Sequence, residues 1–199
     1  VVPEKKYPYP DIVDGNFTRI WTKQMNTPST EVSIYYTFEE PFTNKTDLEL
    51  DIFKRVLQIA YTDSVREEKG GTYGVSVDYS MDKDSSPTSM ITISFRTDPA
   101  KYQELIPIVY NQIQHIADNG PLPSSMDKVK KFLHKSYEQN LTYDQYWDYV
   151  MYEFLRHDID YHTGFGDILD NITPADIQRI AQDLLKSNRR IELTMQSEE

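Results

Sequence analysis

The sequence has no cysteine among its 199 residues, which excludes disulfide bonds, thiolate metal sites and a cysteine nucleophile. It also has no apolar run long enough to cross a membrane. Basic residues are comparatively few: 21 Lys and Arg stand against 32 Asp and Glu, a formal net charge of −11. So acidic a surface repels phosphate backbones and anionic lipids, which argues against nucleic-acid and membrane-surface binding.

Histidine is scarce as well, with only His115, His134, His157 and His162. A zinc hydrolase needs two histidines one helical turn apart with a glutamate beside them. Neither HExxH nor its inverted form HxxEH occurs, and the two closest histidines are five residues apart, which is unfavourable spacing for one helix face. We therefore expect surface or capping histidines, and no metal site in this chain.

Three closely spaced acidic pairs are the remaining candidates for general acid/base chemistry. In so acidic a chain, we interpret such pairs as solvated surface. The pairs are Glu39/Glu40, Glu67/Glu68 and Asp158/Asp160.

The hydrophobic fraction of 38% and aromatic fraction of 13% indicate a folded domain. The first fifteen residues are rich in proline, which favours an extended segment over a packed element. We predict an interdomain linker and lead-in over residues 1–30, so that the chain resembles a piece of a longer polypeptide. Residues 31–199 are predicted to form a single α+β domain.

Hydrophobic periodicity predicts a strand, a helix, a two-stranded hairpin, a series of helices and a closing strand. Helices packed on one face of a mostly antiparallel sheet fit this order best. The predicted strands cover 30–39, 72–81, 89–97 and 190–196, the helices 45–70, 100–118, about 125–140, 142–159 and 173–186, and 163–168 is predicted as a loop.

One stretch, SVREEKGGTYGVSV at 64–77, admits two interpretations. In the first it is a structural corner, where glycine ends a helix and Arg66 in the last turn suits the helix dipole. In the second, the guanidinium of Arg66 and the phenol of Tyr73 converge on a peptide carbonyl. Gly74 favours the second interpretation, because glycine inside a strand lets another backbone approach.

At these residues the sequence resembles the pitrilysin/insulinase family of zinc metallopeptidases, whose zinc motif is the inverted HxxEH. Arg66, Tyr73, Gly74 and Val75 match a family pattern of Arg, six residues, Tyr, a small residue and Val. The segment ITPADIQRIAQDLLKSNRRIELTM at 172–195 resembles the closing segment of the family. The resemblance extends over about residues 32–195.

The resemblance implies a processing-peptidase-like fold and two homologous halves that enclose a peptide in a chamber. One half carries HxxEH and zinc, and the other supplies the Arg and the Tyr. Because HxxEH is absent, this chain resembles the C-terminal, non-metal half of a metalloendopeptidase, a hydrolase active in proteolysis. Its partner would be the HxxEH-bearing N-terminal half, in the same chain or in another subunit.

The resemblance also implies roles for three residues in substrate binding. Arg66 would bind the peptide backbone, Tyr73 would donate a hydrogen bond to the scissile carbonyl as it becomes an oxyanion, and Gly74 would lie beside them. No cofactor is expected in this chain, since zinc would belong to the other half. The fragment alone would be inactive, and family habit favours an extracytoplasmic location such as the bacterial periplasm or envelope.

Two other classes of function stay open at this stage. The chain can be a non-catalytic peptide-binding or assembly module on the same fold. The presence or absence of an HxxEH-bearing half in the native protein distinguishes this alternative from a peptidase. The sequence contains no nucleophile–base pair that would support a third class, an unrelated hydrolase or transferase.

Overall fold

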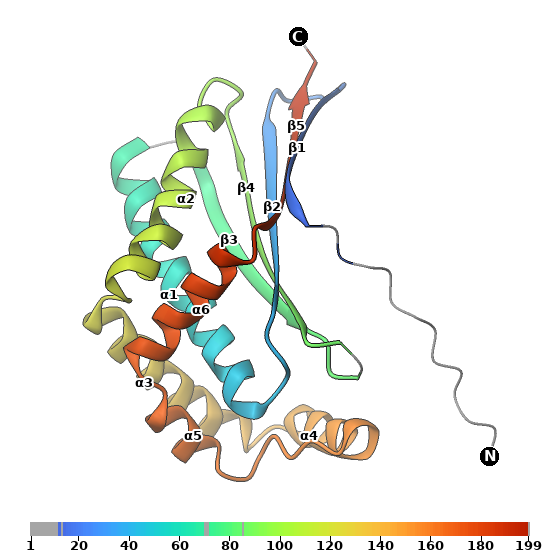
Figure 1. Cartoon of the computed structure of the whole chain (residues 1–199), viewed down its shortest axis with the longest axis vertical. Helices are drawn as coiled ribbons and strands as arrows, with labels where there is room; N and C mark the ends of the chain where they lie inside the picture. Colours follow the sequence, from blue (N-terminus) through green and yellow to red (C-terminus); the bar gives the residue numbers. More distant parts are fainter. Residues whose placement is uncertain (1–11, 13, 70–71, 85, 199) are drawn as a thin grey trace, which may run out of the picture.

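The computed structural model describes residues 12, 14–69, 72–84 and 86–198. They form one five-stranded sheet, with strand order β1-β5-β2-β4-β3, and six α-helices (Figure 1). The elements are β1 (Gly15–Lys23), β2 (Thr30–Glu39), α1 (Asn44–Lys69), β3 (Thr72–Met81), β4 (Thr88–Thr97), α2 (Tyr102–Asn119), α3 (Pro123–Asn140), α4 (Asp144–His157), α5 (Phe165–Asn171), α6 (Pro174–Lys186) and β5 (Arg189–Ser197).

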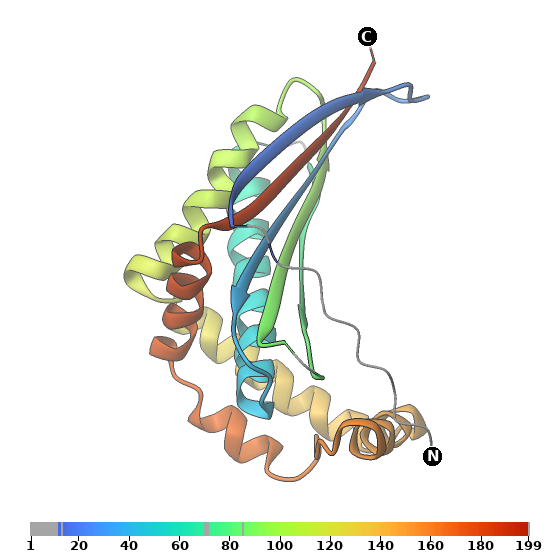
Figure 2. The same ribbon diagram turned by 45° about the vertical axis from the view of Figure 1, so that its right-hand side comes forward.

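The helices lie on one side of the curved sheet, and no helix of the described residues covers its other side (Figure 2). Strand β2 pairs antiparallel with β4 and β5, and β3 pairs antiparallel with β4. Among the described strands, β1 alone pairs in parallel, with β5. The prediction of an α+β domain with helices on one face of a mostly antiparallel sheet is confirmed.

The core lies between this sheet and helices α1, α2 and α6. In β2 every second residue is buried, because side chains alternate between the two faces of a strand. Ile34 and Phe38 from β2 and Phe53 from α1 have 1% or less of their surface exposed. Burying a side chain of this size stabilises the fold by about 1.5–3 kcal/mol. The alternation of apolar residues in the sequence thus identifies the helix-covered face of the sheet.

Helix α6 begins with a capping box. The Thr173 hydroxyl accepts a hydrogen bond from the Asp176 backbone N–H at 3.3 Å, and the Asp176 carboxylate accepts one from the Thr173 N–H at 2.7 Å. Burial opposes ionisation of Asp176, but the bonds from Thr173 and Lys45 outweigh it and lower its pKa to about 2. Helix α6 is thereby fixed at its first turn.

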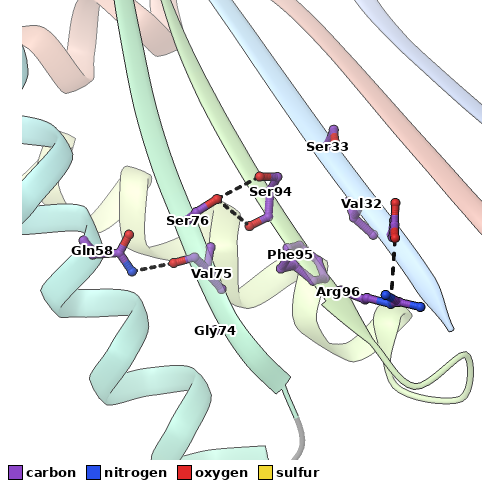
Figure 3. Close-up of a pocket in the computed structure, with 10 residues that line it drawn as sticks. Val32, Ser33, Gln58, Gly74, Val75, Ser76, Ser94, Phe95 and Arg96 are labelled. Carbon is purple, nitrogen blue, oxygen red and sulfur yellow. Dashed lines mark hydrogen bonds and ion pairs between the residues drawn. The ribbon is translucent and has the colours of Figure 1, made fainter.

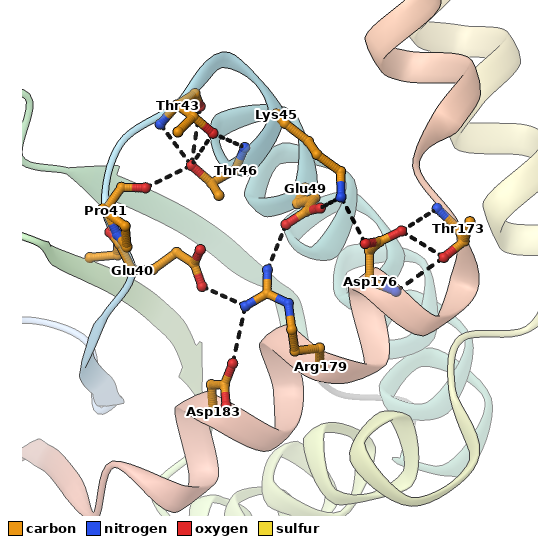
Figure 4. A network of polar contacts seen from close by, with 11 residues as sticks. Glu40, Pro41, Thr43, Lys45, Thr46, Glu49, Thr173, Asp176, Arg179 and Asp183 are labelled. Atoms are coloured by element: carbon orange, nitrogen blue, oxygen red, sulfur yellow. Dashed lines mark hydrogen bonds and ion pairs between the residues drawn. The ribbon is translucent and has the colours of Figure 1, made fainter.

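An ionic network with two buried carboxylates joins α6 to α1 and to the end of β2 (Figure 4). Arg179 donates to Glu40 and to Glu49, each at 2.7 Å, and to Asp183 at 3.1 Å. Glu49 is 1% exposed and Glu40 is 7% exposed. The interpretation of Glu40 as solvated surface is therefore wrong, because a guanidinium from a segment 139 residues away neutralises its charge.

Two elements differ from the sequence-based prediction. Strand β1 lies within residues 1–30, which were assigned to a linker and lead-in, and the division into linker and domain itself stays a prediction. The strand was missed because most of its side chains are exposed on both faces, so its sequence has no alternation. Residues 163–168 were predicted to be a loop, yet α5 begins at Phe165 after Gly164 in the left-handed conformation.

Helix α4 lies at the lower edge of the molecule (Figure 1). Glu153 is its one buried residue within the described chain, and it pairs with Lys83 of the β3–β4 loop at 3.0 Å. A second link joins His157 to Asp84 at 3.0 Å. No helix in the described ranges is both long and apolar enough to cross a membrane.

Candidate functional site

The predicted site lies at the junction between the end of α1 and the start of β3. Arg66 belongs to the last turns of α1, and Tyr73 is the second residue of β3. The side chains of Arg66 and Tyr73 lie outside the described part of the structure, as do residues 70–71 between the two elements. Their roles in substrate binding therefore stay predictions, whereas Gly74 and the surface around it are described.

The start of β3 contains a β-bulge. Thr72 is opposite Thr97 and Val75 is opposite Phe95, so Tyr73 and Gly74 of β3 face a single residue of β4. Gly74 has φ +106°, a backbone conformation that L side chains rarely adopt. Nothing lies within 4 Å of the position that a Cβ would take, so the conformation is what requires glycine here. Bulges bend a strand and re-aim its side chains, often beside functional sites.

Gln58 of α1 fixes the strand immediately after this bulge. Its side-chain nitrogen donates to the Val75 carbonyl, and its side-chain oxygen accepts from the Val77 N–H at 3.2 Å. These backbone groups lie on the edge of β3 that faces away from β4. One amide side chain thus completes the hydrogen bonding that a neighbouring strand would otherwise supply, and it connects the helix of Arg66 to the strand of Tyr73.

A shallow hollow of about 630 Å³ lies beside the bulge (Figure 3). Small residues line it across three strands: Gly74 and Ser76 of β3, Ser94 of β4 and Ser33 of β2. Ser94 is opposite both Ser76 and Ser33, so the three serines form one row across the sheet. The Ser76 and Ser94 hydroxyls are 2.9 Å apart. Because these side chains are short, the hollow has room for an extended chain and offers it hydroxyl groups.

Charge at the hollow comes from one ion pair among the described residues that line it. The Arg96 Nε lies 3.8 Å from Glu31, and its guanidinium also donates to Ser29 at 2.8 Å. Both partners hold Arg96 on the sheet. The described lining therefore supplies hydrogen-bonding groups but no acid/base pair for hydrolysis.

The described residues contain no group of three or more His, Cys, Asp or Glu side chains that could hold a metal ion. The histidines take part in local contacts instead: His134 bonds to Asp170 at 2.7 Å and His162 to Tyr137 at 3.0 Å.

The sequence predicted Gly74 as a site residue, but it missed Gln58 and the row of serines. Gln58 carried a weak signal, since it is a polar residue beside the apolar stripe of α1. The serines carried none, because only the register of β2, β3 and β4 brings them together.

Solved structures similar to this chain include several proteases. The periplasmic protease PqqL from Escherichia coli shares 17% identity with a TM-score of 0.79, over 94% of this chain and 21% of that one. A protease from Helicobacter pylori shares 16% identity with a TM-score of 0.79, over 98% of this chain and 48% of that one. A peptidase M16 inactive domain from Pseudomonas fluorescens shares 14% identity with a TM-score of 0.77, over 98% and 46%. At these identities the likeness concerns the fold, and this chain spans less than half of each neighbour.

A search among curated proteins found no match. A family model does match: the one described as "Peptidase M16 inactive domain" covers residues 2–133, about two thirds of the chain. This description agrees with the expectation that the chain itself carries no metal site. The chain belongs to the peptidase M16 family, as a copy of its inactive domain.

Proposed function

We propose that this chain is the substrate-binding half of a zinc-dependent endopeptidase that cleaves peptides between two homologous halves. The observation that carries the proposal is the bulge formed by Tyr73 and Gly74 beside an open hollow, one connection away from the helix of Arg66. Membership of the M16 family supports the peptidase class.

Zinc would be held by the HxxEH-bearing half, where it supplies a nucleophilic water at neutral pH. The residues of this chain would act on the peptide. The Arg66 guanidinium would donate to a substrate backbone carbonyl, and the Tyr73 hydroxyl would donate to the scissile carbonyl oxygen as negative charge develops there. The serine row would contact the extended chain on either side.

Such donors work only when they are held in place before the substrate arrives. Two described features support this requirement. The bonds of Gln58 to Val75 and Val77 fix the start of β3 against α1. The positive φ of Gly74 fixes the shape of the bulge that contains Tyr73.

The test is peptide hydrolysis by the complete native protein, with bound zinc quantified, for Arg66→Ala and Tyr73→Phe. Loss of an oxyanion donor is expected to reduce kcat about 10²–10³-fold in Tyr73→Phe. Loss of a charge-assisted bond worth about 1.5–3 kcal/mol is expected to reduce kcat/KM about 10–150-fold in Arg66→Ala. Both variants should keep the melting temperature and zinc content of the wild type.

Tyr152→Phe is the matched control, because Tyr152 is an exposed tyrosine of α4 far along the chain from the bulge. If the native protein binds no zinc, or if the Arg66 and Tyr73 variants cleave as fast as this control, the peptidase proposal fails. A non-catalytic peptide-binding or assembly module would then be the better description of the chain.

A further inference from the structure

A second cavity lies among the helices, between α1, α3, α4 and α5, and shares no lining residue with the hollow at Gly74. Its volume is about 290 Å³, which suits one small molecule or one side chain. Two carboxylates, one guanidinium and four phenols line it: Asp47, Asp51, Arg55, Tyr137, Tyr146, Tyr149 and Tyr161.

Asp47 is the carboxylate of this cavity that lacks a cationic partner among the described ion pairs. Asp51 is paired with Arg55 at 2.9 Å, whereas Asp47 accepts a hydrogen bond from the neutral Tyr79 hydroxyl at 3.0 Å. Burial raises the pKa of Asp47, so its charge is poorly solvated where it stands. The first turn of α1 partly offsets this cost, because the helix dipole favours an anion there.

Tyr146 and Tyr161 stay neutral and present electron-rich rings. Burial raises the pKa of Tyr146 to about 12, and burial together with the charge of Asp47 also raises the pKa of Tyr161. Neutral aromatic rings next to one carboxylate attract organic cations, through the ring quadrupole and the opposite charge. Among the described residues, no group of three or more His, Cys, Asp or Glu side chains that could hold a metal ion lies here.

Two of these rings, those of Tyr149 and Tyr161, already lie near a cation. The Lys83 ammonium lies 5.0 Å from the centroid of the Tyr161 ring and 5.7 Å from that of Tyr149. The centroid of the Phe42 ring lies 5.5 Å from the same ammonium group, and the Glu153 carboxylate pairs with that group at 3.0 Å. Lys83 is thus paired with Glu153, although its charge also favours the ionised form of Asp47, and its contacts show that these two tyrosines can lie around a cation.

We propose that the cavity binds an alkylguanidinium or alkylammonium group, with Asp47 as its counter-ion and the tyrosine rings around its alkyl part. This chemistry can come from a free small amine or from a basic side chain of a peptide. The proposal is independent of the proposed peptidase function, since it uses neither Arg66 nor Tyr73.

The test is calorimetric titration of the intact protein with agmatine, a small alkylguanidinium. We expect saturable one-site binding, weakened at least tenfold in Asp47→Asn, which keeps an acceptor for the Tyr79 hydroxyl. Asp127→Asn is the matched control, because it removes the same charge from an exposed position of α3 outside the cavity. Melting curves of both variants establish that they are folded.

Butylurea, a neutral probe of similar shape, distinguishes charge recognition from filling of the cavity. We expect no measurable binding of butylurea. The proposal is overturned if agmatine does not bind, if butylurea binds as tightly, or if Asp127→Asn weakens agmatine binding as much as Asp47→Asn does.

N-acetyl-arginine methylamide then separates the two sources of the cation. If it binds with an affinity similar to that of agmatine, the cavity is open to basic side chains of peptides. If agmatine alone binds, the ligand is a free amine. In either case, Asp47→Asn should weaken binding of the ligand at least tenfold.

Discussion

Two regions of this molecule are stabilised by different kinds of contact. The first, which we call the sheet region, consists of β2–β5 with α1, α2 and α6, and its interface is filled by apolar side chains with almost no exposed surface. The second, the α4 region, consists of α4 and the segment 158–164. It is held by aromatic rings and by charged pairs at its edges.

This difference predicts how the stability of each region responds to a destabilising substitution. An apolar interface between packed layers unfolds cooperatively, so that a defect in it reduces the stability of the whole domain. A helix with one buried residue can open locally at low cost, because few apolar contacts are lost. The sheet region should therefore set the global stability, and the α4 region should set local dynamics.

The largest expected effect tests this comparison with the same substitution in both regions. Phe53 of α1 is 0% exposed and Phe154 of α4 is 54% exposed. Phe53→Ala should lower the free energy of unfolding by about 3–5 kcal/mol, since it leaves a cavity in the core. Phe154→Ala should lower it by less than about 1 kcal/mol. Urea denaturation measures both values, and similar losses in the two variants would contradict the comparison.

The second effect concerns the ionic network inside the sheet region. Arg179→Met removes the cation paired with Glu40, which leaves this carboxylate buried without a cationic partner among the described ion pairs, whereas Glu49 keeps Lys45 at 3.0 Å. We expect a loss of about 3 kcal/mol, near the lower end for a broken buried pair, because Arg179 is itself 40% exposed. Lys131→Met is the control, since its pair with Asp127 is exposed and worth at most about 1 kcal/mol. Chemical denaturation in which both variants lose the same stability would show that the network contributes nothing.

The third effect is local. Lys83→Met removes the charge that neutralises Glu153 and holds α4 to the β3–β4 loop. We expect amide hydrogen exchange in α4 to accelerate at least tenfold, equivalent to about 1.4 kcal/mol of local stability, while α1 amides keep their protection. If exchange in α1 accelerates equally, the two regions open as one unit and the comparison is wrong.

The smallest effect appears at acidic pH. Because the pKa of Asp176 in the folded chain is about 2, below the ordinary value of 3.8, its contribution is present above about pH 4 and is lost as the pH falls toward 2. Asp176→Asn should cost about 1 kcal/mol at pH 6 and make the acid loss of stability shallower. Asp127→Asn serves as the control. Melting curves between pH 6 and 2.5 measure the slope, and an unchanged slope in Asp176→Asn would count against this account.

The sheet region was largely predictable from the sequence, because its physics is periodic. Alternation in β2 and β4 and the apolar stripes of α1 and α6 gave the correct elements within a few residues. Strand β1 could not be predicted, since a strand exposed on both faces has no period. Glu40 was misjudged for a related reason: the partner that allows its burial is 139 residues away.

The candidate site was predictable only where local chemistry is distinctive. The glycine in a strand pointed to Gly74, whose φ of +106° gives the physical reason. The bulge, the contact of Gln58 and the serine row depend on strand register, which a single sequence does not encode locally. Residues from four helices line the aromatic and acidic cavity, so no local pattern in the sequence could indicate it.

The contact of Gln58 with β3 also affects which edge of the sheet can pair with a further strand. At one end of the sheet, a side-chain amide already occupies the outer backbone groups of Val75 and Val77. At the other end, β1 has a neighbour on one side within the described chain and exposes Phe17, Ile20 and Trp21. An additional strand, whether from a partner or from an aggregating copy, would therefore join the sheet at β1.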